Sequence, residues 1–129
     1  MIRQYVSNIE RLFSSSPIVL SSDFQKHFDP LEKSLYIKGV VIFIDASVLS
    51  IAIFLVKSGN KIQPEKYRFQ YMDSKGEMLF RYDNARHHPE LKTFPHHKHT
   101  GNTVKETAMP DIEDIINEIS VIILKRRSS

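Results

Sequence analysis

Between residues 34 and 82, runs of β-branched and aromatic residues are separated by short polar reversals, and this pattern constrains the fold more than any other feature of the chain. The runs span 34–44, 48–56, 66–72 and 78–82. The reversals are Asp45-Ala46-Ser47 and two glycine-containing turns at 57–61 and 73–77. Connections this short join antiparallel neighbours. The segment therefore predicts a four-stranded antiparallel meander at about 34–82.

The side-chain alternation differs between these runs. In the third run Tyr67, Phe69 and Tyr71 alternate with polar residues, which is typical of a strand with one solvated face. The first two runs are apolar at most positions. Both of their faces are therefore expected to be covered.

Two amphipathic helices flank the predicted sheet. The first is predicted near residues 2–13, and the second at about 111–125, where Asp111 can act as the cap. Residues 18–33 are predicted to be a connector with one helical turn. Because 129 residues support one core, we expect a single α+β domain, 1–129, with both terminal helices packed on the sheet.

Composition excludes several classes of protein. The chain has no cysteine, which excludes disulfides, thiolate metal sites and cysteine nucleophiles. Residues 39–56 are apolar, but Asp45 lies in the middle, where a carboxylate costs about 2.5–3.5 kcal/mol in a membrane. The N-terminal residues have helical spacing and an acidic residue in place of a continuous apolar stretch, so no signal peptide is expected.

Chemistry is expected in a histidine-rich segment at about 83–105. Five of the six histidines lie between residues 80 and 99. The region also carries more basic than acidic side chains, within a chain of formal net charge +3. Positive potential of this kind suits an anionic partner. As a cluster, these histidines indicate function, although any single one could serve only to hold a loop by hydrogen bonds to its backbone.

Strand geometry limits which of these histidines can converge. If 94–99 is extended, His97 and His99 project to one face, and His96 and Lys98 to the other. A site would then combine His97 and His99 with His88 and with Arg81 or Asp83.

The run YRFQYMDSKGEMLFRYDNARHHPELKTFPHHKH, residues 67–99, resembles the signature of TumE-type toxins of bacterial and archaeal toxin–antitoxin systems. The resemblance extends more loosely from residue 34 through the final helix. Arg86 departs from it, since a smaller or less basic residue is expected there. The resemblance implies a cytoplasmic toxin held by an antitoxin, commonly a helix-turn-helix protein.

Three functions suit these residues. A metal-independent endoribonuclease would use histidines as acid and base and a cation for the phosphorane charge. The catalytic candidates are His88, His97, His99, Arg81 and Asp83, and the substrate-binding candidates are Lys98, Arg86, His87 and His96. No cofactor is then required. A metal-dependent hydrolase would instead hold a divalent ion on His97, His99 and Asp83.

The third function is a non-catalytic module that binds nucleic acid or protein through the same basic segment. The expected partners are the antitoxin, RNA and, in a homodimer, a second copy of the chain. No membrane partner is expected.

Overall fold

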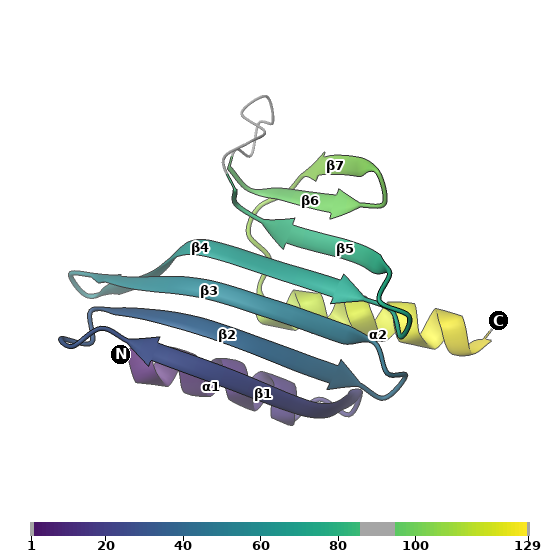
Figure 1. The fold of residues 1–129 in the computed structure, drawn as a ribbon, viewed down its shortest axis with the longest axis horizontal. Helices are drawn as coiled ribbons and strands as arrows, with labels where there is room; N and C mark the ends of the chain where they lie inside the picture. The colour runs from purple at the N-terminus through teal and green to yellow at the C-terminus, as the bar shows by residue number, and fades with distance from the viewer. Residues whose placement is uncertain (1, 86–94, 129) are drawn as a thin grey trace.

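A seven-stranded antiparallel sheet forms the body of the protein, and both helices lie against it (Figure 1). The computed structural model describes residues 2–85 and 95–128. In chain order the elements are α1 (Ile2–Ser14), β1 (Val19–Phe28), β2 (Ser34–Phe43), β3 (Val48–Ser58), β4 (Lys61–Met72), β5 (Met78–Asp83), β6 (His97–Thr100), β7 (Thr103–Glu106) and α2 (Ile112–Ser128). The strands are neighbours in chain order from β1 to β7.

The α+β class, the antiparallel meander and the terminal helices are confirmed, but the number of four strands is wrong. Residues 19–28 form an edge strand paired with β2, where the sequence indicated a connector. The polar side chains of β1 remain solvated, while Phe24 and Phe28 pack against the core. The alternation of apolar and polar residues that marks a half-buried strand is therefore incomplete in this segment.

The sheet also continues into the histidine-rich segment. His97–Thr100 pairs with β5, and Thr103–Glu106 returns beside it as β7. Both strands are only four residues long and contain polar side chains. Backbone hydrogen bonds to the neighbouring strands hold these residues in the sheet. Their polar side chains show no apolar alternation from which a strand could be predicted.

The core lies between one face of the sheet and the two helices. In β2 and β3, buried and more exposed positions alternate along the strand. The buried set includes Leu35, Ile37, Ile51 and Ile53, which join the cluster containing Phe13 of α1 and the isoleucines of α2. We call this the helix face.

The opposite side is the open face, which carries residues such as Tyr36, Val40, Phe54, Arg68 and Asp83. Tyr36 and Val40 are 39% and 46% exposed. The expectation that both faces of 34–56 are covered is therefore wrong for the described residues, because both helices pack on the same side. In that part of the chain, neither helix is long and apolar enough to cross a membrane.

Candidate functional site

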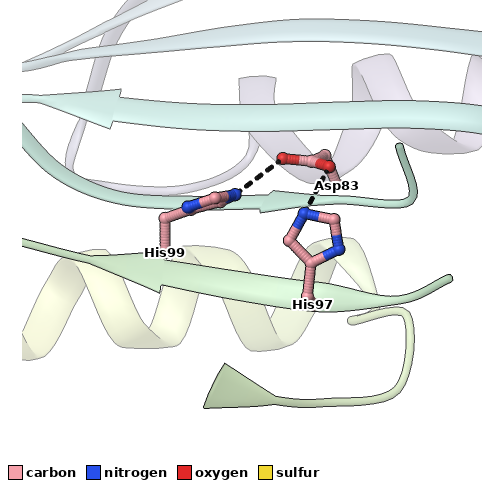
Figure 2. A group of neighbouring side chains, drawn as sticks. All are labelled: Asp83, His97 and His99. Atoms are coloured by element: carbon pink, nitrogen blue, oxygen red, sulfur yellow. Dashed lines mark ion pairs between the residues drawn. The ribbon is translucent and has the colours of Figure 1, made fainter. Parts of the chain in front are cut away.

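Pairing of β5 with β6 brings four predicted site residues together on the open face. Asp83 lies opposite His97, and Arg81 lies opposite His99. Because residues i and i+2 of a strand share a face, all four side chains project to the same side. We call Arg81, Asp83, His97 and His99 the Asp83 cluster; Figure 2 shows its carboxylate between the two imidazole rings.

Asp83 is the centre of the cluster and is only 5% exposed. Its Oδ1 lies 2.8 Å from Nε2 of His97 and accepts the backbone N–H of Ala85 at 3.0 Å. Its Oδ2 accepts Nε–H of Arg81 at 2.9 Å and lies 3.5 Å from Nε2 of His99. A buried carboxylate needs such partners, since desolvation otherwise disfavours its charge.

His97 is fully buried and holds its ring between two oxygen acceptors. Its Nδ1 donates to the carbonyl of Pro95 at 2.9 Å, while Nε2 faces Asp83. A histidine can donate from both nitrogens only as the charged imidazolium. The contact between Nε2 and Oδ1 of Asp83 has the distance of an ion pair. His97 can therefore orient Asp83, but it is too buried to touch a substrate.

His99 and Arg81 form the more accessible half of the cluster, with 14% and 29% of their side chains exposed. Nη2 of Arg81 lies 3.0 Å from Nε2 of His99. Because a guanidinium only donates, this contact uses a lone pair on Nε2 of His99, which corresponds to the tautomer with the ring hydrogen on Nδ1. The arrangement places the accessible imidazole beside a permanent cation.

The same side chains have the composition of a metal site. One ligand atom from each of Asp83, His97 and His99 can be chosen so that all lie within 4.8 Å of one another. Histidines that bind a metal ion commonly donate their other ring nitrogen to a backbone carbonyl, as Nδ1 of His97 does to Pro95. However, Arg81 already donates to both Asp83 and His99. A divalent ion on these ligands would therefore compete with the guanidinium for two of them.

Two other predicted substrate contacts lie away from the cluster. Lys98 projects to the helix face, where Nζ donates to Glu118 of α2 at 2.6 Å. Burial lowers the pKa of Lys98, but the hydrogen bonds with Glu118 and Tyr82 outweigh it and leave the pKa raised. His96 stacks on Tyr67, with ring centroids 5.7 Å apart. Arg86, His87 and His88 lie outside the described residues.

The open face also holds cations and rings that the site prediction did not include. Arg68 is paired with Asp83 across β4 and β5, and Lys66 is paired with Phe54 across β3 and β4. A broad hollow beside the cluster is lined by Tyr36, Phe54, Lys66, Arg68, Arg81 and Asp83, among other residues. The alternation at 66–72 indicated that Lys66 and Arg68 lie on a solvated face. It could not indicate that Arg68 lies opposite Asp83, because the register between β4 and β5 sets that pairing.

Comparison with known proteins identifies the family. No curated protein and no solved structure matches the chain. The family model described as toxin TumE matches residues 9–127. This match covers most of the chain, which therefore belongs to the TumE toxin family.

Proposed function

We propose that this chain is the toxin of a toxin–antitoxin pair and that it cleaves RNA without a metal ion, using the Asp83 cluster. The observation that carries the proposal is the position of Arg81, which bridges Asp83 and His99. A permanent cation next to a neutral imidazole supplies two of the requirements of phosphodiester cleavage, namely charge stabilisation and a base.

In the proposed reaction, a substrate phosphate takes over the N–H groups of Arg81. This frees Nε2 of His99, which accepts the proton of the 2′-hydroxyl while the 2′-oxygen forms its bond to phosphorus. The bond from phosphorus to the 5′-oxygen breaks, and the leaving oxygen takes a proton from an acid. The products are a 2′,3′-cyclic phosphate and a 5′-hydroxyl. Arg81 neutralises the charge that develops on the phosphorane.

Burial divides the roles of the two cluster histidines. His99 is the base, because its ring reaches solvent. His97 is a positioning residue that acts through Asp83, because it is 0% exposed. His88 was predicted as an acid/base candidate, and we propose it as the acid. Arg86 and His87 remain predicted substrate-binding residues. Lys98 and His96 are not assigned contacts here, because their partners lie on the helix face.

The test is to incubate the purified chain with end-labelled RNA in the presence of a strong chelator, and to identify the product ends. We expect cleavage that survives chelation, leaves 2′,3′-cyclic phosphate ends and spares a substrate made with 2′-deoxynucleotides. Loss of cleavage on chelation would support a metal ion instead. Binding without cleavage of any RNA would support a non-catalytic module.

A metal-dependent hydrolase is the second candidate, favoured by one specific observation. Asp83, His97 and His99 supply one carboxylate and two imidazoles with nearby ligand atoms, and such N and O donors suit zinc and other divalent ions. This candidate requires Arg81 to leave both Asp83 and His99. Binding of zinc to the unmodified chain would be its direct evidence.

Membership of a toxin family implies an antitoxin as the partner. We propose, following the sequence resemblance, that this antitoxin is a helix-turn-helix protein and that the pair acts in the cytoplasm. Copurification of the chain with the product of an adjacent gene tests this proposal. Recovery of the chain without any bound protein from cells that express both genes would count against it.

A further inference from the structure

The open face next to the Asp83 cluster has a definite order of side chains. Cross-strand pairing places Arg68 between Asp83 on β5 and Ala52 on β3. Two residues before Arg68 on β4 and on the same face, Lys66 pairs with Phe54, which in turn pairs with Tyr36 on β2. Since neighbouring strands lie about 4.8 Å apart, these residues form a continuous surface that leads away from the cluster.

The two rings on this surface are available to a ligand. Tyr36 is 39% exposed, and Phe54 is half-buried. Within residues 2–85 and 95–128, neither ring packs against another aromatic side chain, whereas Phe80, Tyr71 and Tyr67 all do so on the helix face. The small side chain of Ala52 lies beside them and lines the same hollow.

The charges of the hollow complement a polyanion. In the described part of the chain, neither Lys66 nor Arg68 forms an ion pair, and Arg81 is the third cation that lines the hollow. Its carboxylates are Asp83, which Arg81 neutralises, and Glu65. The hollow has a volume of about 1120 Å³, which is larger than a typical site for one small molecule.

Exposed rings beside lysine and arginine are the elements with which proteins hold unpaired nucleotides. Bases stack on the rings, and the cations follow the phosphates. A double helix hides the faces of its bases, so rings offer it nothing to stack on. The combination therefore favours a single strand over a duplex.

We infer that the open face between β2 and β5 binds single-stranded RNA, with bases stacked on Phe54 and Tyr36 and phosphates on Lys66 and Arg68, and that it leads the strand to the Asp83 cluster. This inference rests on the proposed function and names the form of RNA that the site accepts. A second copy of the chain or the antitoxin on the same face would be the competing occupants.

The experiment measures binding of a labelled, unstructured RNA by fluorescence anisotropy, in a His99→Ala background that prevents cleavage. Phe54→Leu and Tyr36→Leu remove a ring but keep apolar bulk, and each should weaken binding about 5- to 150-fold, the range for loss of one stacked base. Phe54→Tyr and Tyr36→Phe keep a ring and should bind as the background does. A duplex of the same sequence should bind more weakly than the single strand.

Two arginine variants complete the design. Arg68→Gln should reduce the steepness with which log affinity falls against log salt concentration by about 0.7. Arg11→Gln, at an exposed position of helix α1, should leave this slope unchanged. Circular dichroism of every variant checks that the fold is kept. The inference is overturned if the leucine variants bind RNA like the background, or if Phe54→Leu dissociates a dimer while RNA affinity stays the same.

Cleavage by the unmodified chain separates failure of this inference from failure of the proposed function. If the chain cleaves RNA and the Phe54→Leu variant cleaves and binds equally well, the inference fails and the proposed function stands. If the open face binds single-stranded RNA that the chain never cleaves, the proposed function fails and the binding site stands. If RNA is neither bound nor cleaved, both fail.

Discussion

Nη2 of Arg81 lies 3.0 Å from Nε2 of His99, and Nε of the same guanidinium lies 2.9 Å from Oδ2 of Asp83. One side chain thus connects the buried carboxylate with the accessible imidazole. The guanidinium and a divalent ion would compete for the same two partners, so the bridge is the contact at which the proposed metal-independent site and the metal-dependent alternative can be told apart.

Replacement of Arg81 should expose that competition. Arg81→Ala removes the cation from two candidate ligands, so it should abolish cleavage and, at the same time, allow zinc to bind to Asp83, His97 and His99. Isothermal titration with zinc measures this gain. Arg81→Lys keeps the charge but not the fork geometry, so it should retain only part of the activity. Tight zinc binding by the unmodified chain would contradict the proposal that Arg81, and not a metal ion, holds Asp83 and His99.

Replacement of the two cluster histidines should have different effects. His99→Ala should slow cleavage about 100- to 10,000-fold with little change in stability, because the ring is the proposed base and reaches solvent. His97→Ala should cost about 1–3 kcal/mol of unfolding free energy, because it removes one partner of the buried Asp83 and the donor to the Pro95 carbonyl. Thermal unfolding and cleavage assays measure both effects.

Added imidazole provides the control for that comparison. It should restore part of the activity of the His99→Ala variant, since the vacated space is open to solvent. The His97→Ala variant should not respond, because its ring is fully buried. Rescue of the His97→Ala variant but not of the His99→Ala variant would indicate that His97 is the base and His99 the positioning residue.

Asp83→Asn should reduce cleavage without removing the side-chain volume. An amide cannot balance the charge of Arg81 and offers one acceptor oxygen in place of two, so Arg81 and His97 lose their orientation. We expect a loss of about 100-fold or more, measured as single-turnover cleavage. Glu65→Gln changes another carboxylate of the same hollow and is the matched control. Equal activity of the Asp83→Asn variant and the unmodified chain would remove Asp83 from the site.

Gly39 tests the packing of the first strand on the core. A Cβ atom at Gly39 would lie 2.3 Å from Cδ1 of Phe24, whose ring packs 5.9 Å from that of Phe13. Gly39→Ala should therefore destabilise the fold by about 1–3 kcal/mol, measured by urea unfolding. In the Phe24→Ala background the same substitution should cost much less, since the clash is gone. Equal costs in both backgrounds would show that the ring is not the obstacle.

Asp73 provides a test of pH dependence. Backbone N–H bonds, that of Glu77 first, hold the pKa of Asp73 below its ordinary value of 3.8. The stabilisation is then complete above the unfolded-state pKa and is lost as pH falls through the lower folded-state pKa. Asp73→Asn should therefore destabilise the chain at neutral pH, with a difference that shrinks at pH values below 3.8. Asp23→Asn, on an exposed position of β1, is the control, and unfolding by urea at several pH values measures both.

Much of the fold was readable from local patterns. The runs at 34–44, 48–56, 66–72 and 78–82 predicted four central strands, since their apolar positions and tight reversals are local signals. The alternation at 97–99 likewise predicted that His97 and His99 share a face. The polar strands β1, β6 and β7 were not predicted, because such strands obtain their stability from the neighbours they pair with.

The sequence by itself determined the strand-forming segments, the two amphipathic helices and the presence of a histidine-rich basic segment, because periodicity and residue type act over short distances along the chain. Only the tertiary structure decided that Asp83 lies opposite His97 and that Lys98 turns towards Glu118. It also decided that one sheet face stays open. The register between strands and the side on which helices pack result from contacts between residues far apart in the chain, so no local pattern specifies them.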